Sequence, residues 1–505
     1  MAQLNQRPFT PGSYPTVVVG SGPGGLQVSY FLTRLGVDHA VISADDAPGG
    51  MFQQFPVFQR LVTWTKPQAP AARDSHRYEW FDWNSLLAEE PEHRFLVRGL
   101  MHRGSYFPTR DEMEKGLSSF AEHTGVRVRY GTVWQGTRRV EDGFVLATSD
   151  GDYHCKVAIF AVGMAQPWKP AIEGLADVPH YVEVKAPSDY AGKRVLMIGK
   201  RNSGFELADG LLTHARQIIL VSPRPARISV LTHSTAAARA RYLQPYEDHV
   251  LGGGNVELDA SIERVERTRR GYRVHTRRTA TPDGLVLDVD EVIAATGFAV
   301  PLGDRPNLGV ATFYQNRRPA QTPFWESATV PGIYFAGAIT QGAVGLKKYG
   351  IPSNSGAVHG FRYNARVLAS HIAGKHFGIK GAGRVVKPGD IVDHLLRQAA
   401  NAPDLWNQQS YLARVVEHSA SEGVVDRGAF PLAHFADAGG PDAAAITIET
   451  DTSGDIHPAL YVRRNGDVTE HLLQSDPFHD FTTEQHRAHV HAILSDLIRA
   501  QLDAS

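Results

Sequence analysis

Two glycine-rich turns decide the fold of this chain. The first follows an apolar strand and opens a helix in "VVVGSGPGGLQVSYFLTRLG", residues 17–36, and it reads G-x-G-x-x-G over residues 20–25. The second repeats the arrangement in "VLMIGKRNSGFELADGLL", residues 195–212, with G-x-R-x-x-G over residues 199–204. Another apolar stretch follows each helix, so each turn begins a βαβ unit. A chain with two such units is expected to bind two dinucleotides.

The order of the glycines in the first turn suits a pyrophosphate. Gly20 permits the tight turn, Gly22 lets the backbone approach the phosphates, and Gly25 allows the helix to pack closely on the strand. Gly24 lies in the same turn, at a helix N-terminus whose partial positive charge would face the anion. We expect one dinucleotide to stay bound and the other to visit, which indicates FAD and a nicotinamide cofactor.

The acid that usually holds the ribose is missing from the first unit. Ser43 stands in its place, 23 residues after Gly20. A serine hydroxyl can still bond the sugar, and Asp45 or Asp46 could reach it as well. This departure concerns the details of the site and not the cofactor.

The second unit suits NADPH better than NADH. Ser222 occupies the acid position, 23 residues after Gly199, and Arg224 and Arg227 follow it. Arginine without a carboxylate matches a 2′-phosphate, which accepts paired hydrogen bonds from a guanidinium. The alternative is that both arginines are solvated turn residues. Gly204 is expected to bring the helix and the strand together.

Arg201 departs from the pattern, because it stands where the second glycine is expected. Two interpretations are open. Either Arg201 swings outward and clamps the phosphates from the side, or the second site has lost its function. We favour the clamp, since Lys200, Arg201, Arg224 and Arg227 would together make a basic mouth.

The composition is that of a globular protein without a marked electrostatic partner. The 505 residues are 42% hydrophobic and 21% charged, with a net charge of -1 and a pI near 7.1, so we expect no nucleic-acid partner. No apolar run reaches the ~18 residues needed to span a bilayer. Residues 1–15 show no apolar stretch of a secretory signal, so a cytoplasmic location and no membrane partner are expected.

The single cysteine, Cys155, lies on a predicted strand in "YHCKVAIF". It has no second cysteine to pair with, and the chain has no C-x-x-C motif that could relay electrons as a dithiol. We interpret Cys155 as a core residue.

The predicted fold class is α/β. It comprises two Rossmann-like dinucleotide-binding domains, one of them inserted in the other, and a small α+β C-terminal domain. After a tail of residues 1–15, the FAD-binding domain takes residues 16–168 and 286–378, the NADPH-binding domain 169–285 and the C-terminal domain 385–505. Within the C-terminal domain, the pattern predicts helices over 390–406 and 484–502 and strands over 444–450 and 459–466. This domain is expected to be a lid, a dimer surface or a substrate adaptor, so a homodimer is possible.

Further motifs resemble those of the class B flavin monooxygenases, which belong to the two-dinucleotide flavoproteins. They are "GGMF" at 49–52, "YFPTRDEMEKGL" at 106–117, "AVG" at 161–163, "NSGFE" at 202–206 and "ATGF" at 295–298. "DWNSLL", "GSYFP" and "HGFRYNAR" are similar to FAD-dependent oxidoreductase domain-containing proteins. The resemblance covers about residues 14–375.

This resemblance implies FAD and NADPH as cofactors and adds residues to their sites. Beside the turn residues named above, they are Gly50, Met51, Phe52, Thr65, Val133, Ala161, Gly163, Asn202, Ser203, Thr296, Gly297 and Gly337. Two departures stand out. The family's F-x-G-x-x-x-H spacing does not fit His180, and the usual Gly-Asp near the flavin is Gly337-Ala338 here.

The resemblance also implies a reaction. NADPH would reduce FAD, O2 would add at the flavin C4a, and the resulting hydroperoxide would oxygenate a nucleophile. A small amine is the favoured substrate, which makes the chain an N-oxygenase. Sulfur oxygenation and Baeyer–Villiger oxygenation are alternative reactions of the same family. The other hypotheses are an NADPH-dependent oxidase or reductase that passes electrons to another acceptor, and a flavin-holding interaction protein with a dead second site.

Three residues are the candidates for catalysis. Lys66 could donate to the reacting oxygen or the nicotinamide, unless it is a solvated loop residue. Asn84 could donate to the adduct, although helix capping by Asp82 or Asn84 explains the motif equally well. His233 could face the nicotinamide or be a hydrogen-bonded structural residue.

Other histidines suggest weaker roles. His359 and Arg362 stand where the closing helix starts, whose positive end would help a flavin carbonyl carry charge, and helix packing explains them nearly as well. His486, His489 and His491 do not share one helix face, so we expect no metal site.

Overall fold

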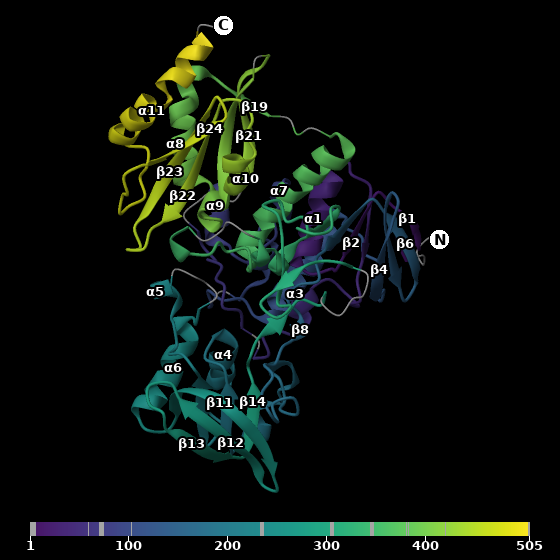
Figure 1. The fold of residues 1–505 in the computed structure, drawn as a ribbon, viewed down its shortest axis with the longest axis vertical. Helices are drawn as coiled ribbons and strands as arrows, with labels where there is room; N and C mark the ends of the chain where they lie inside the picture. Colours follow the sequence, from purple (N-terminus) through teal and green to yellow (C-terminus); the bar gives the residue numbers. More distant parts are fainter. Residues whose placement is uncertain are drawn as a thin grey trace.

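The computed structural model describes the backbone of residues 7–502 with short gaps, and side chains up to residue 495. The gaps are residues 59, 70–74, 103, 233–236, 303–307, 344–347, 380, 382 and 420. The predicted fold class is confirmed: two Rossmann-like sheets and a third, antiparallel sheet form three successive parts. Figure 1 shows the insert (teal) below the first domain and the C-terminal part (yellow-green) above it.

The first domain is built on a four-stranded parallel sheet whose residues are all buried. The strand order is β18 (Ile333–Phe335), β7 (Val157–Phe160), β2 (Thr16–Val19) and β3 (His39–Ile42). Val18 faces the helices α1 (Pro23–Arg34) and α7 (Val358–Phe377), whereas Val17 and Val19 face a second sheet. The second sheet has the order β1 (Gly12–Ser13), β6 (Gly151–Cys155), β5 (Gly143–Thr148) and β4 (Trp134–Val140). Burial on both faces explains the continuous apolar runs of the parallel strands.

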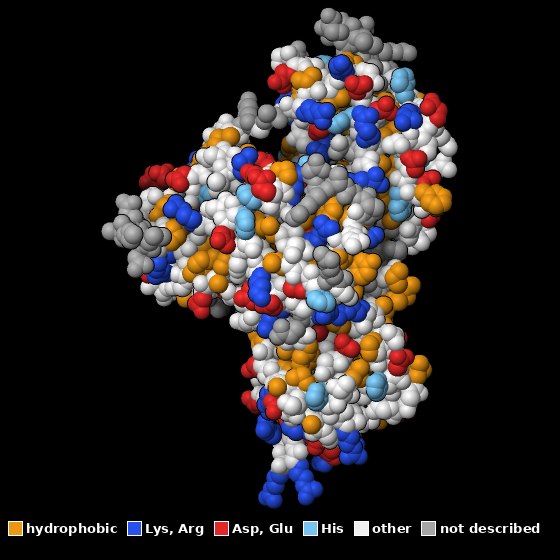
Figure 2. Space-filling model, turned by 180° about the vertical axis from the view of Figure 1, so that it is seen from behind, with side chains coloured by type: hydrophobic (Ala, Val, Ile, Leu, Met, Phe, Trp, Pro, Cys, Tyr) orange, Lys and Arg blue, Asp and Glu red, His pale blue; other side chains and the backbone are white. Residues whose placement is uncertain are grey.

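The insert has its own six-stranded sheet. Its order is β13 (Gly284–Val289), β12 (Gly271–Arg278), β11 (Val256–Thr268), β10 (Gln217–Ser222), β9 (Arg194–Ile198) and β14 (Glu291–Ala294). β14 pairs with β9 in parallel register, so residue 286 falls inside the insert. We therefore place the proposed return to the first domain after β14, and not at 286 as expected from the sequence. Arg269 and Arg270, which join β11 to β12, are exposed, and Figure 2 shows basic side chains at the lower tip of the molecule.

The C-terminal part is an antiparallel sheet with helices on both faces, and the short helix α10 (Leu432–Asp437) covers the face that carries Ala413 and Ala445. The sheet order is β19 (Arg384–Val386), β21 (Gly423–Pro431), β20 (Leu412–Ser419), β22 (Ala443–Thr450), β23 (Ile456–Arg464) and β24 (Asp467–Leu472). α8 (Ile391–Asn401) and α11 (Glu484–Leu502) pack on the face that carries Ile446 and Leu460. The sequence predicted β22, β23 and both helices, and it missed β20, β21 and β24. No described helix has the length and apolar character to cross a membrane.

The C-terminal part shares one continuous core with the first domain through α7. α7 is buried on several sides because α1 covers one of them and α9 (Pro403–Asn407) another. An ion network crosses the boundary: Asp404, 2% exposed, accepts hydrogen bonds from Arg366 of α7 at 2.8 Å and from Arg414 of β20 at 3.4 Å. Because this carboxylate joins elements of both parts, it fixes their relative position.

We predict that Asp404→Asn weakens this junction. The change leaves two guanidinium groups without their shared anion in a largely buried place, which should cost about 2–3 kcal/mol. The apparent midpoint of urea unfolding, followed by tryptophan fluorescence, should fall clearly. Asp111→Asn is the matched control, since Asp111 pairs with Lys115 on the exposed face of α3 (Arg110–Thr124) and should leave the midpoint unchanged. Equal midpoints for both variants would contradict the role of Asp404.

Candidate active site

The first glycine turn is closed by backbone contacts that exclude side chains. Gly20 has φ +112°, and a Cβ there would lie 2.6 Å from the carbonyl oxygen of Ala161. A Cβ on Gly25 would overlap the carbonyl of Gly20, and one on Gly24 would overlap the backbone of Gly337. The turn, the end of β7 and the segment after β18 therefore meet at one point, at the carboxyl ends of the parallel strands where α/β sheets bind ligands.

Gly22 differs from its neighbours, because the protein leaves room for a side chain there. Its backbone is extended, with φ -69° and ψ 178°, and a Cβ would be 3.7 Å from the Cα of Gly50. Neither strain nor a clash within the protein requires glycine at this position. We propose that the requirement comes from a ligand at the N-terminus of α1, where the pyrophosphate of FAD would fit.

The "GGMF" segment, residues 49–52, packs against the first glycine turn. Gly50, Met51 and Phe52 belong to the 3-10 helix η1 (Gly50–Gln53), and the sulfur of Met51 would be 3.5 Å from a Cβ on Gly163. These residues thus lie where the resemblance puts the cofactor, and their contact with it remains a proposal.

At the proposed ribose end of the first site, hydrogen bonds hold a carboxylate in a fixed position. The Asp45 Oδ2 accepts hydrogen bonds from the hydroxyl groups of Ser21 at 3.0 Å and Ser43 at 3.1 Å. Ser43 itself is buried, whereas Asp46 is exposed. We propose that Asp45 takes the part of the missing acid. Val133, 45% exposed, follows Gly131 and Thr132, whose N–H groups bond the carbonyls of Asp45 and Ser43, and we propose it as an apolar surface for the adenine.

At the other end of the site, His359 is a buried histidine with no hydrogen bond to either ring nitrogen within the described residues. It lies in the first turn of α7 and stacks on Trp83, with ring centroids 4.1 Å apart and planes 17° apart. Burial, together with the charges of Arg362 and Arg239, holds the pKa of His359 well below its usual value, so the ring is neutral. Unpaired buried nitrogens indicate a polar partner. The polar edge of a flavin, close to the positive end of α7, fits this requirement.

The predicted catalytic loop is held by its own hydrogen bonds. The Asn84 amide donates to the Thr65 hydroxyl at 2.9 Å and to the Thr63 carbonyl, and Asp82 accepts from the backbone N–H groups of Asn84 and Ser85. Both amide N–H groups of Asn84 are thus used, as is the hydroxyl hydrogen of Thr65, which bonds Asp82. Asn84 supports the loop as a positioning residue, and a direct role as a donor to the flavin adduct does not fit these bonds.

The other candidates divide in a similar way. The Lys66 ammonium pairs with no carboxylate of the described chain and lies 5.6 Å from the ring centre of Phe81. Arg362 is buried and donates to the carbonyls of Ser85 and Glu79, so helix packing accounts for it. His233 lies outside the described residues.

The second glycine turn has the same backbone construction as the first. Gly199 has φ +132°, and a Cβ on Gly204 would overlap its carbonyl. Asn202, at the start of α4 (Asn202–Leu211), accepts from the backbone N–H of Arg239 at 2.9 Å, and Ser203 follows it in the same turn. Thr296, which follows β14, donates its hydroxyl to the carbonyl of Trp168 and so ties these two segments together.

Arg201 lies in a cluster of three arginines. Its backbone is extended and its side chain exposed. Burial lowers the pKa of Arg317 and of Arg318, and the positive charge of Arg201 lowers both further. Arg317 lies over Gly297, 2.8 Å from where a Cβ would be, and stacks on Trp168. None of the three pairs with a carboxylate of the described chain. Guanidinium groups that repel one another and lack counter-ions favour a phosphate ligand. This supports the clamp, and sequence reasoning missed Arg317 and Arg318 because they lie in a distant hairpin.

Lys200 does not belong to that basic mouth, contrary to expectation. Its side chain is 1% exposed and pairs with Glu257 at 3.2 Å and with Asp259. Arg224 and Arg227 are exposed after β10, and the Ser222 hydroxyl donates to the carbonyl of Arg224 at 2.9 Å. Both side chains are therefore accessible, and their contact with a 2′-phosphate remains a proposal.

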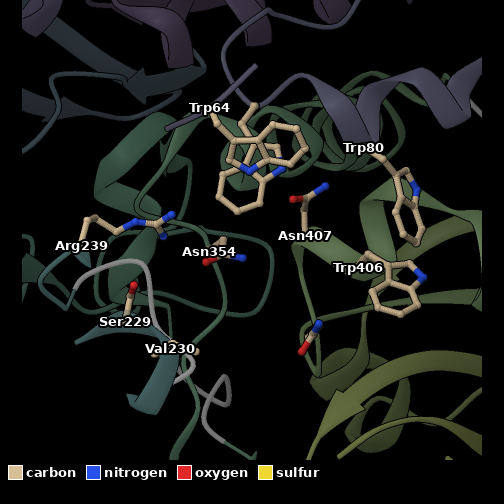
Figure 3. Close-up of a pocket in the computed structure, with 10 residues that line it drawn as sticks. Trp64, Trp80, Ser229, Val230, Arg239, Asn354, Trp406 and Asn407 are labelled. Atoms are coloured by element: carbon tan, nitrogen blue, oxygen red, sulfur yellow. The ribbon is translucent and has the colours of Figure 1, made fainter. Parts of the chain in front are cut away.

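A cavity of about 480 Å³ lies where the three parts meet. Figure 3 shows Trp64 and Trp80 of the first domain, Arg239 of the insert and Trp406 of the C-terminal part around it. It is lined by Trp64, Trp80, Trp83, Ser229, Val230, Arg239, Asn354, Trp406, Asn407 and Gln409. Trp83 also contacts His359, so the cavity adjoins the proposed flavin end of the site. Its size is that of a small-molecule site.

Two dinucleotide turns and an adjoining cavity define a two-dinucleotide flavoprotein. The family model "pyridine nucleotide-disulphide oxidoreductase" matches residues 17–337, more than half of the chain. The chain belongs to this family, and the comparisons imply FAD and NADP(H) as its cofactors.

Individual relatives agree on the class. The chain is 27% identical over 438 residues to FAD-dependent oxidoreductase domain-containing protein 2 of Mus musculus, covering 79% of this chain and 64% of that protein, which is less than two thirds of its length. It is 25% identical over 335 residues to ferredoxin–NADP reductase of Thermus thermophilus, covering 64% of this chain and 84% of that one. The fold is similar to that of a flavin-containing monooxygenase from Stenotrophomonas maltophilia, with a TM-score of 0.54, 19% identity and coverage of 72% and 99%.

We predict that Gly22→Ala removes FAD without unfolding the chain. The backbone and the neighbours of Gly22 accept a Cβ, so the added methyl group should obstruct the cofactor alone. The ratio of flavin to protein absorbance after purification should fall by more than half, while the circular dichroism spectrum stays that of the wild type. Gly99→Ala, where a Cβ meets nothing within 4 Å, is the control. Full flavin content in Gly22→Ala would refute this placement of the pyrophosphate.

We predict that Arg201→Gln weakens NADPH binding and leaves FAD in place. Losing one charge-assisted contact should raise the dissociation constant for NADPH about 10- to 100-fold. The measurement is flavin bleaching during anaerobic titration with NADPH. Arg216→Gln removes an equal charge from an exposed site of the insert and should behave like the wild type. Tighter NADPH binding in Arg201→Gln would show that the arginine blocks the site.

Proposed function

We propose that this chain is an NADPH-dependent flavin monooxygenase that oxygenates the nitrogen of a small amine. The amine, O2, NADPH and a proton would give the N-oxygenated product, NADP⁺ and water. Bound FAD would take a hydride from NADPH and react with O2. The residues of this chain hold the cofactors, place the amine in the cavity and restrict the access of water.

The observation that carries this proposal is the three-sided cavity next to the Trp83–His359 pair. Aromatic walls from two parts of the chain, with polar side chains between them, line a space for a small substrate at the proposed flavin end of the site. Such surroundings slow the loss of a reactive oxygen species to water. A chain that only passed electrons to a large protein acceptor would not need such an aromatic cavity.

Transfer of electrons to a disulfide is disfavoured by the only cysteine in the sequence. Cys155 lies on β6 and is buried, and burial raises the pKa of its thiol to about 12. The thiolate needed for exchange with a disulfide is therefore scarce at neutral pH. An acceptor other than a disulfide is the second candidate, because a relative carries the name ferredoxin–NADP reductase.

The absence of acids from the described cavity lining favours an uncharged amine. None of the ten lining residues is Asp or Glu. An ammonium ion would find no counter-charge there, whereas a neutral amine keeps the lone pair that attacks an electrophilic oxygen. Lys66, which has a free ammonium group in the described chain, stays the proposed proton donor in this step.

The test follows oxygen from ¹⁸O2 into product. We expect purified holoenzyme with NADPH and a panel of aromatic amines to form hydroxylamine or N-oxide products that carry one ¹⁸O, with NADPH and product near 1:1. Cys155→Ala should give the same ratio. Release of all the oxygen as hydrogen peroxide, together with fast reduction of ferredoxin or a quinone, would establish the reductase instead. In parallel assays with an aryl sulfide or a ketone as substrate, labelled sulfoxide or labelled ester would move the assignment to sulfur or Baeyer–Villiger oxygenation.

A further inference from the structure

The cavity has one charged residue among its described lining, and that residue is Arg239. It stands at the start of α6 (Ala240–Leu251), on the insert side of the cavity. Its side chain is partly buried and pairs with no carboxylate within the part of the chain that the structure describes. Burial alone lowers the pKa of this guanidinium, as expected for a cation without a counter-ion.

The position of Arg239 is fixed by the second dinucleotide turn. The Asn202 side chain accepts from the backbone N–H of Arg239 at 2.9 Å and donates to the carbonyl of Ala237 at 2.9 Å. Figure 3 shows the Arg239 side chain extending into the space between Asn354 and Trp64. A desolvated cation that is held in place and faces a cavity is a binding group for an anion.

The remaining walls favour a flat ring. Trp64 and Trp83 form one aromatic pair, with centroids 5.4 Å apart, and Trp80 and Trp406 form another, with centroids 4.8 Å apart. Trp80 donates to the carbonyl of Asn401 and Trp406 to that of Ala399, so these two indoles are fixed in place. Rigid indole faces bind planar rings well.

We infer that the cavity binds a planar aromatic compound that carries one carboxylate, with the carboxylate on Arg239 and the ring between the tryptophan pairs. Two alternatives fit less well. An aromatic cage suits a cation, but here the guanidinium would repel it and no acid of the described lining would attract it. A neutral hydrocarbon would leave Arg239 buried without a partner.

The bound compound is a substrate only if the proposed function holds, so the inference rests on that function. It also adds a role for the C-terminal part. Trp406, Asn407 and Gln409 complete the wall opposite the insert, so the cavity does not exist without this part of the chain. Of the three roles expected for the C-terminal domain, a substrate adaptor is the one that these contacts support.

Binding is measured without turnover, so that it can fail separately from the proposed function. Oxidised holoenzyme, without NADPH, is titrated with 4-aminobenzoate, and then with the isosteric but uncharged 4-aminobenzamide, by flavin absorbance and tryptophan fluorescence. We expect 4-aminobenzoate to bind at least tenfold more tightly than the amide. Equal affinities, or stronger binding of the cationic 4-aminobenzylamine, would overturn the inference.

Two variants locate the groups. Arg239→Gln should abolish the preference for the carboxylate, and Trp406→Leu should weaken both ligands by a similar factor and keep the preference. Arg270→Gln, an equal change of charge in the exposed β11–β12 turn, should bind like the wild type. If Arg239→Gln keeps the preference, or slows anaerobic reduction by NADPH while the preference persists, Arg239 serves NADPH and the inference is wrong. If the ligands bind as expected but no ¹⁸O product forms, the carboxylate-binding site is supported and the proposed monooxygenase function is rejected.

Discussion

The backbone contact between Gly24 and Gly337 is the constraint on which the site depends. Only glycine allows the start of α1 to touch the segment that follows β18, more than 300 residues further along the chain. The contact brings the first turn, the end of β7 and the approach to α7 to one edge of the sheet. It also sets where α7 begins, and therefore where His359 and the positive end of this helix lie. A side chain at either glycine would move the two ends of the dinucleotide site apart.

α7 passes this geometry on to the rest of the molecule. One side packs on α1, and the other is joined to the C-terminal part by the shared core and by the Arg366–Asp404 pair. The position of Trp406 relative to the flavin end of the site is thus determined by a helix that belongs to the first domain. This explains how a domain that follows the region matched by the family model can form part of a cavity beside the proposed cofactor site: it docks on α7, which packs on α1 of that site.

The sequence predicted the parts of the fold that rest on local rules. Strand–turn–helix patterns with glycine at fixed spacing identify the two Rossmann-like units, because the steric reason for each glycine lies within a few residues. It did not predict β20 and β21. β20 pairs with both β21 and β22, so these strands depend on contacts that are not local in the sequence. It also missed Arg317 and Arg318, and it assigned Lys200 to the phosphate mouth. Whether a lysine meets an anion of the protein or of a ligand is decided by partners such as Glu257 and Asp259, which lie far away in sequence.

Pairing separates the structural cations of this protein from those that are available to ligands. Lys200, Lys348 and Arg366 are all bound to carboxylates, and each one ties two elements of the chain together. Arg201, Arg317, Arg318 and Arg239 have no such partner in the described chain, and all but the exposed Arg201 are partly buried. Keeping partly buried guanidinium groups unpaired costs stability unless a ligand compensates for it. Three of these arginines surround the second dinucleotide turn and one faces the cavity, which is the distribution that a nucleotide with several phosphates and a separate, singly charged substrate would require.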